Sequence, residues 1–143
     1  MSTISPDAVD DATSAESISS SIWLTGTTGE VTTLDINADV TAGARRNLDE
    51  TGFGHVGVIT RDGAEGAAEH GPYDRIIVTV GAWDILRAWW DQLVSGGRLV
   101  LPLRWRGTTS AVAFIKRNDH FDSDCVVARR DRWRPTRCRG TPT

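Results

Sequence analysis

The segment YDRIIVTV, residues 73–80, is the most clearly patterned part of this 143-residue sequence. Its second half, residues 76–80, contains only β-branched side chains, which favour an extended backbone. A nearly continuous run of this kind is typical of a strand that is buried on both faces of a parallel sheet. We therefore expect residues 73–80 to form a central strand.

Strand and helix patterns alternate along the chain before this strand. The β-branched run at 31–36 predicts a strand, and the segment 38–50 predicts an amphipathic helix because its apolar residues recur every four positions on one face. Asn37 is a good N-cap for this helix, and Gly52 supplies a C-terminal stop. The first part of the chain thus predicts a strand that leads directly into a helix.

Further elements continue the alternation. They are a short strand at 56–60, a weak helix at 64–70, an amphipathic helix at 84–93 capped by Asp84, and a strand at 98–102. Apolar runs at 111–115 and 125–128 are expected to add antiparallel strands at the edge. Alternating strands and helices predict a doubly wound α/β fold with a mostly parallel sheet.

The two ends of the chain differ from this middle part. Residues 1–21 are rich in Ser, Ala, Asp and Thr and offer little apolar surface for packing, so we expect a disordered acidic leader. Residues 129–143 carry many arginines and are expected to form a flexible basic tail. Residues 22–128 then make up one partial domain.

Composition narrows the classes of function. A net charge of −3 and a pI near 5.5 argue against a dominant phosphate-binding surface, so we expect no nucleic-acid partner. No run approaches the roughly 18 apolar residues of a membrane span and no signal peptide is evident, so we expect no membrane association and a cytoplasmic location. Two cysteines are too few for a metal quartet or a disulfide framework, and the three histidines lack ligand spacing, so no metal site is expected.

Three candidate site segments follow strands that should end at the same edge of the sheet. Asp35 is placed to accept hydrogen bonds from ribose hydroxyls, although it would equally favour the start of the next helix. Asp62-Gly63 is placed to meet a nucleobase, although Asp-Gly is also a common turn pair. The residues Thr79-Val80-Gly81-Ala82 would let a ligand approach the backbone, and they also suit a tight turn.

Four of the six tryptophans, Trp83, Trp89, Trp90 and Trp105, raise the alternative of a stacking surface. Because Trp89 and Trp90 lie in the predicted helix at 84–93, at least one of them should face the sheet. For the group as a whole we favour packing in the core over a stacking surface.

Four sequence blocks between Gly29 and Pro102 resemble the protein-L-isoaspartate O-methyltransferase family, which belongs to the class I S-adenosylmethionine-dependent methyltransferases. In chain order they are GEVTTLDI with VTAGARRNL, GFGHVGVITRDG, GPYDRIIVTVGAWDI and DQLVSGGRLVLPL. The third and fourth blocks are the most specific, because many methyltransferases share the fold but few share both blocks. The resemblance covers about half of the chain.

The resemblance implies S-adenosylmethionine as the cofactor. It implies that Asp35 is the ribose-binding acid with Ile36 beside it, that Asp62 and Gly63 lie near the adenine, and that residues 79–82 border the methyl-transfer site. The implied substrate is a protein or peptide with an isoaspartyl residue, or with a chosen aspartyl residue in a precursor peptide. Trp83 stands where the family usually has proline, and the segment after Pro102 departs from the family pattern, so the substrate loop is left unassigned.

The family's first strand and its glycine-rich loop, which surround the methionine part of the cofactor, have no match in this sequence. Residues 22–26 lie too close to the strand at 31–36, because a parallel crossover needs at least about 10–12 residues. We therefore expect the first βα unit to be absent. This predicts an exposed edge in the sheet, and either marginal stability or a second chain that completes the sheet.

Methyl transfer from a sulfonium to a carboxylate needs no general base, because a carboxyl group with a pKa of about 4 is already deprotonated at neutral pH. No catalytic residue is assignable, since the family's Ser or Thr lies in the missing segment. The leading hypothesis is an isoaspartate-type methyltransferase chain whose activity in isolation is open. The alternatives are a non-catalytic remnant or interaction subunit, and a peptide-tailoring aspartate methyltransferase.

Overall fold

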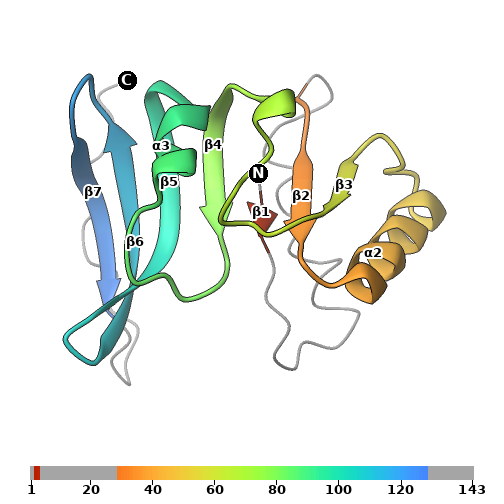
Figure 1. The fold of residues 1–143 in the computed structure, drawn as a ribbon, viewed down its shortest axis with the longest axis horizontal. Helices are drawn as coiled ribbons and strands as arrows, with labels where there is room; N and C mark the ends of the chain where they lie inside the picture. Colours follow the sequence, from red (N-terminus) through yellow and green to blue (C-terminus); the bar gives the residue numbers. More distant parts are fainter. Residues whose placement is uncertain (1, 4–28, 129–143) are drawn as a thin grey trace.

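The computed structural model describes residues 2–3 and 29–128 of the chain. Its elements are β1 (Ser2–Thr3), β2 (Thr32–Asp35), α2 (Ala38–Glu50), β3 (Gly57–Thr60), the 3-10 helix η1 (Ala68–His70), β4 (Tyr73–Val78), α3 (Arg87–Gln92), β5 (Leu93–Trp105), β6 (Thr108–Lys116) and β7 (Phe121–Ala128). The strands form one seven-stranded sheet in the order β3-β2-β1-β4-β5-β6-β7 (Figure 1). Strands β1 to β5 run parallel and β6 and β7 are antiparallel, which confirms the predicted α/β fold with an antiparallel edge.

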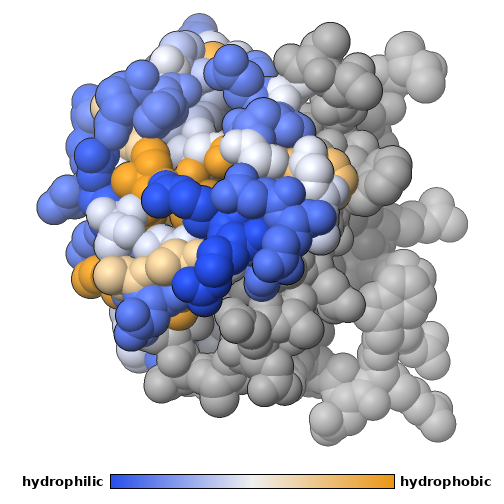
Figure 2. All heavy atoms as spheres, turned by 90° about the vertical axis from the view of Figure 1, so that its right-hand side faces the viewer, coloured by the Kyte–Doolittle hydropathy of each residue, from blue (hydrophilic) through white to orange (hydrophobic). Residues whose placement is uncertain are grey.

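Helix α2 has the bounds that the sequence predicted. The side chain of Asn37 caps it, accepting a hydrogen bond from the N–H of Asp39 at 2.9 Å. At the other end Gly52 has a φ of +83°, a left-handed conformation that glycine adopts at little cost. Figure 2 shows the end of the molecule that carries α2 and β3, where most of the described surface is hydrophilic.

Two hydrophobic clusters lie on opposite faces of the sheet. Successive side chains of a strand point to opposite faces, and in β3 Val58 packs in one cluster while Ile59 packs against the other. The first cluster joins α2, through Ala44 and Leu48, to β3 and to Val31, the residue before β2. The second joins α3, through Trp89, to β4 and β5. Helices therefore cover both faces, as a doubly wound fold requires.

The centre of the sheet differs from the expectation. Strand β1 consists of two residues, Ser2 and Thr3, which pair in parallel with the middle of β2 and with the carboxyl end of β4 (Figure 1). The predicted exposed edge between β2 and β4 is therefore wrong at these positions, because the backbone of residues 2–3 occupies the place of a central strand. The same two residues depart from the disorder expected for residues 1–21.

Other expectations fall on parts of the chain that the structure does not describe. These are the remainder of the leader, the segment at 22–26, the tail at 129–143 and Cys138. On β7, Cys125 is disulfide-bonded. The sequence analysis did not predict this bond, because the two cysteines are far apart in the chain. Across residues 2–3 and 29–128, none of the helices has both the length and the apolar character needed to cross a membrane.

Several predicted boundaries are wrong. Strand β4 ends at Val78 and not at residue 80, and β6 and β7 begin at Thr108 and Phe121, earlier than the predicted residues 111 and 125. Helix α3 begins at Arg87 and not after Asp84, whose carboxylate instead accepts the N–H of Ile85 at 2.7 Å. Strand β5 is thirteen residues long, far longer than 98–102, because it pairs with β4 from Leu93 onward and with β6 as far as Trp105. Only a short 3-10 helix, η1, forms within the weak helix expected at 64–70.

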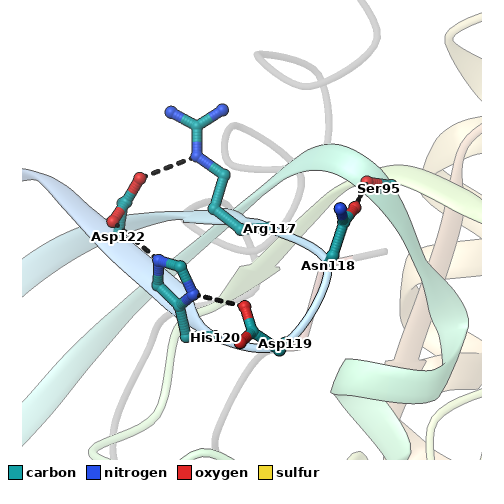
Figure 3. Close-up of polar contacts among 6 residues, drawn as sticks. All are labelled: Ser95, Arg117, Asn118, Asp119, His120 and Asp122. Atoms are coloured by element: carbon teal, nitrogen blue, oxygen red, sulfur yellow. Dashed lines mark hydrogen bonds and ion pairs between the residues drawn. The ribbon is translucent and has the colours of Figure 1, made fainter.

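The turn between β6 and β7 carries a cluster of exposed charged side chains (Figure 3). The Nδ1 atom of His120 lies 2.6 Å from a carboxylate oxygen of Asp119, and its Nε2 atom lies 3.2 Å from Asp122. Arg117 donates a hydrogen bond to the other oxygen of Asp122 at 2.7 Å. The hydrogen bond with Asp119 is the main cause that raises the pKa of His120 above its usual value.

We expect this cluster to make the stability of the turn depend on pH. Because the folded turn raises the pKa of His120, its stabilising contribution is fully present below the usual value of 6.5 and is lost as the pH rises through the higher folded pKa. An NMR titration of the His120 ring should give a pKa above 6.5 in the wild type and a lower one in Asp119→Asn. Asp39→Asn, on α2, serves as the remote control. An equal His120 pKa in the wild type and Asp119→Asn would contradict the assignment.

Candidate functional site

The candidate residues meet at the carboxyl edge of the parallel strands, the lower edge in Figure 1. Asp35 ends β2 and is paired with Thr60, the last residue of β3. Strand β4 ends at Val78 and lies two positions along the sheet, with β1 between it and β2. Since neighbouring strands lie about 4.8 Å apart, the ends of β2 and β4 are roughly 10 Å apart. The fold thus brings all three predicted segments to one edge.

Asp35 is a buried carboxylate with one unpaired oxygen. Only 4% of the residue is exposed. Its Oδ1 atom accepts a hydrogen bond from the N–H of Asn37 at 2.7 Å, whereas Oδ2 is buried and has no hydrogen-bond partner within the described part of the chain. A buried carboxylate oxygen without a partner is costly, so this atom is suited to accept a hydrogen bond from a ligand. The neighbouring Ile36 is 64% exposed and offers an apolar surface beside it.

The loop that follows β3 begins beside Asp35. The N–H of Arg61 donates to the backbone carbonyl of Asp35 at 2.9 Å, which joins the two strand ends. Asp62 is exposed, and its carboxylate accepts the N–H of Ala64 at 2.8 Å, while Gly63 is buried. Asp62 and Gly63 therefore lie in the loop that starts at the same edge as Asp35, the position that the sequence pattern gives them.

Three side chains that the sequence did not assign to the site hold this loop in place. The indole N–H of Trp89 donates to the carbonyl of Gly63 at 2.8 Å. The side-chain amide of Gln92 accepts from the N–H of Ala67 at 2.9 Å and donates to the carbonyl of Glu65 at 2.8 Å. We call Trp89, Gln92 and Tyr73 the loop clamp.

Tyr73, the third member of the clamp, lies at the start of β4. Its hydroxyl donates to the carbonyl of Ala67 at 2.7 Å. Burial raises the pKa of Tyr73, so the hydroxyl keeps its proton, and with it this hydrogen bond, well above neutral pH. The shape of the loop after β3 is thus supported by side chains from α3 and β4.

Trp89→Phe is expected to lower the free energy of unfolding by about 1–3 kcal/mol, because it leaves the buried carbonyl of Gly63 without its donor. Urea denaturation followed by circular dichroism measures this change. Trp90→Phe is the matched control, since no hydrogen bond from the Trp90 indole is present within residues 2–3 and 29–128. Equal destabilisation by the two substitutions would show that the Trp89 hydrogen bond contributes nothing.

The segment Thr79–Ala82 leaves the end of β4 and is fastened to β5. The N–H of Ala82 donates to the carbonyl of Pro102 at 2.9 Å, and the N–H of Arg104 donates to the carbonyl of Ala82 at 2.8 Å. Thr79 and Gly81 are exposed, Val80 is half-buried and Ala82 is buried. The exposed residues Thr79 and Gly81 therefore lie at the same edge as Asp35, in a segment that hydrogen bonds hold to β5.

The tryptophans do not behave as one group. Trp89 is buried, as expected for core packing, but Trp83 and Trp105 are 73% and 69% exposed. The preference for core packing is therefore wrong for these two residues: Trp83 follows the end of β4, and Trp105 is the last residue of β5. His55, His70 and His120 are exposed.

A cavity of about 460 Å³ lies away from this edge. Its lining includes Asp74 and Arg75 at the start of β4 and the turn Ser95–Gly97. These residues belong to the amino-terminal halves of β4 and β5, so the cavity lies toward the opposite edge of the sheet from Asp35. It is not part of the candidate site.

The sequence profile of the protein-L-isoaspartate(D-aspartate) O-methyltransferase family matches residues 19–129. The chain belongs to this family. A protein-L-isoaspartate O-methyltransferase of Hyperthermus butylicus is 40% identical over 92 residues, which cover 64% of this chain and 38% of the relative. One from Koribacter versatilis is 39% identical over 74 residues, which cover 52% of this chain and 33% of the relative. The chain thus spans well under half the length of these two relatives.

Solved structures show the same fold. A protein-L-isoaspartate O-methyltransferase superposes with a TM-score of 0.68 at 29% identity, covering 73% of this chain and 34% of that one. A protein of the same name from Plasmodium falciparum, in complex with S-adenosyl-L-homocysteine, gives a TM-score of 0.56 at 17% identity and covers 72% of this chain and 53% of that one. The second likeness supports the Rossmann-like methyltransferase fold alone.

Proposed function

We propose that this chain takes part in S-adenosylmethionine-dependent methyl esterification of isoaspartyl residues in proteins or peptides, in the cytoplasm. The observation that carries the proposal is the buried, unpaired oxygen of Asp35 at the carboxyl edge of the sheet, in a member of this family. In open α/β sheets, ligands bind at this edge, where the strand order lets loops from neighbouring strands diverge.

Asp35 fits the ribose of such a cofactor. Its Oδ2 atom would accept a hydroxyl hydrogen bond that no described residue supplies, while the N–H of Asn37 keeps the carboxylate in position. A hydrogen bond to a charged acceptor contributes about 1.5–3 kcal/mol. Because only 4% of Asp35 is exposed, a ligand reaches Oδ2 only when part of the surrounding chain moves aside.

The adenine would lie against the loop after β3. Ile36 provides an exposed apolar side chain, and Asp62 provides an exposed carboxylate one strand away. The loop clamp fixes the backbone of Gly63 and Ala67, so that this half of the site is shaped before a ligand arrives. Preorganisation of this kind reduces the entropy that binding would otherwise lose.

When bound, S-adenosylmethionine supplies an activated methyl group on a sulfonium. The chain's own task is then to hold a substrate carboxylate against that group and to exclude water. The exposed backbone of Thr79–Ala82 lies at the edge where this alignment would happen, and its hydrogen bonds to β5 keep it rigid. No proton has to be removed from the substrate, since its carboxyl group is already ionised at neutral pH.

A second candidate is that a second polypeptide completes the site. Strand β1 contributes only two residues between β2 and β4, and the chain covers 38% and 33% of the two relatives described above. A longer strand from a partner would pair with more of β4 than Ser2 and Thr3 do. Size-exclusion chromatography with light scattering would detect such an assembly.

Titration calorimetry of the purified chain with S-adenosylhomocysteine tests the proposal. Saturable one-site binding, followed by transfer of a radiolabelled methyl group to an isoaspartyl peptide as an alkali-labile ester, is the expected result. A folded chain that binds no S-adenosylhomocysteine would contradict independent activity and favour the second candidate or a non-catalytic remnant. Transfer to an ordinary aspartyl peptide, and not to an isoaspartyl one, would favour peptide tailoring.

A further inference from the structure

Two exposed side chains, Trp83 and Arg104, stack on each other at the carboxyl edge. The guanidinium carbon of Arg104 lies 4.5 Å from the centre of the Trp83 ring. Trp83 is 73% exposed, and Arg104 is exposed as well. A stacked pair that leaves this much aromatic surface in water adds little to the core, and its exposed faces remain accessible to a ligand.

The fold holds this pair in one place. Ala82 bridges to Leu103, and the backbone hydrogen bonds of Ala82 fasten the loop after β4 to the end of β5. A Cβ atom on Gly81 would lie 3.3 Å from Cδ of Arg104, so the arginine side chain runs closely over this glycine on its way to Trp83. The stacked pair therefore lies directly beside the exposed backbone of residues 79–82.

The stacked guanidinium is free to bind an anion. Within residues 29–128, ion pairs to carboxylates are formed by Arg61, Arg87, Arg98 and Arg117, and Arg104 forms none with a carboxylate of that range. Stacking covers the flat face of a guanidinium but leaves its N–H donors, which lie in the plane, available for a carboxylate. Asp84, next to Trp83, uses its carboxylate to accept the N–H of Ile85.

We propose that Arg104, held by Trp83, binds an acidic side chain that flanks the methyl-accepting residue, so that this chain selects acidic peptide segments. The inference rests on the proposed function, because it assumes that the substrate carboxylate that accepts the methyl group lies beside residues 79–82. The flanking acidic residue would then reach Arg104. Membership in a family described as acting on protein isoaspartyl residues favours a peptide carboxylate over the phosphates of a single-stranded nucleic acid, which a guanidinium and an indole could also bind.

Fluorescence anisotropy with two labelled isoaspartyl peptides tests the inference on the full chain. The peptides differ only in one flanking residue, Glu in one and Gln in the other. We expect the Glu peptide to bind about tenfold more tightly, the effect of one charge-assisted hydrogen-bonded pair. Arg104→Gln should abolish the difference, and Arg104→Lys and Trp83→Ala should reduce it, since a lysine lacks the planar donors and an unstacked arginine is less ordered.

Arg106→Gln is the matched control. Arg106 lies in the turn after β5, with its guanidinium carbon 6.0 Å from the Trp105 ring, and its removal should leave the discrimination unchanged. Equal binding of the two peptides by the wild type, no binding of either, or discrimination that persists in Arg104→Gln would overturn the inference. So would an affinity for single-stranded DNA that exceeds the affinity for the Glu peptide and disappears in Arg104→Gln.

S-adenosylhomocysteine binding, measured on the same preparations, separates this inference from the proposed function. Arg104→Gln should bind S-adenosylhomocysteine as the wild type does, because Arg104 is remote from Asp35 across β1 and β4. A wild type that binds S-adenosylhomocysteine but does not distinguish the peptides overturns the acidic selection alone. A wild type that does not bind S-adenosylhomocysteine overturns the proposed function itself.

Discussion

Asp35→Ala is expected to weaken S-adenosylhomocysteine binding at least about 100-fold, since it removes hydrogen bonds to a charged acceptor that together contribute roughly 3 kcal/mol. Asp35→Asn keeps one acceptor oxygen but loses the charge, and we expect a smaller loss, on the order of tenfold. Titration calorimetry measures both dissociation constants.

Two controls distinguish a lost ligand contact from a damaged fold. Asp35 also accepts the N–H of Asn37, so each variant is first compared with the wild type in urea denaturation. Asp39→Asn removes an exposed carboxylate from the first turn of α2, four residues away, and should leave the dissociation constant unchanged. Wild-type affinity in a folded Asp35→Ala variant would show that Asp35 does not hold the ligand.

The parts of the site that the sequence predicted are those set by local pattern. Asp35 and Asp62 each follow a β-branched run, so the ends of the strands, and with them the common edge, could be inferred residue by residue. Asn37 and Gly52 similarly mark the ends of α2 through capping chemistry that involves only neighbouring residues.

The loop clamp could not be inferred in this way, because it depends on contacts between distant segments. The sequence pattern places Trp89 and Gln92 in a helix and favours a core position for Trp89. Their hydrogen bonds to residues 63–67 form only when α3 packs over the loop after β3. The sequence does contain one indication of the loop clamp. A glutamine on the buried side of an apolar helix needs hydrogen-bond partners, and Gln92 is 8% exposed.

Pairing between distant segments also explains why some predicted helix and strand boundaries are wrong. The pattern at Asp84 suits a helix start, yet α3 begins only at Arg87: Ala82 is fastened to β5, residues 83–84 form a bend, and Leu86 is extended. Likewise, Ser2 and Thr3 carry no strand pattern of their own. They pair with backbone N–H and C=O groups of β2 and β4, which lie on either side of them. Backbone pairing of this kind depends little on the side chains of a two-residue segment.

Gly66 is where a single methyl group should do most damage to the site. Its φ of +68° is left-handed, and a Cβ atom added there would collide with the side-chain amide of Gln92. The amide cannot swing away freely, because both of its ends are hydrogen-bonded to the loop. Gly66→Ala must therefore break part of the clamp as well as adopt a strained backbone.

We expect Gly66→Ala to lower the free energy of unfolding by about 3–4 kcal/mol, of which 1–2 kcal/mol is the left-handed backbone and the remainder the lost hydrogen bonds of Gln92. Gly52→Ala isolates the backbone part, because Gly52 has a φ of +83° but no atom within 4 Å of an added Cβ. Urea denaturation should thus show a loss of only about 1–2 kcal/mol for Gly52→Ala. If both substitutions had the same effect, Gln92 would be yielding without cost, and the loop beside Asp35 would not be held in the shape that the proposed cofactor site requires.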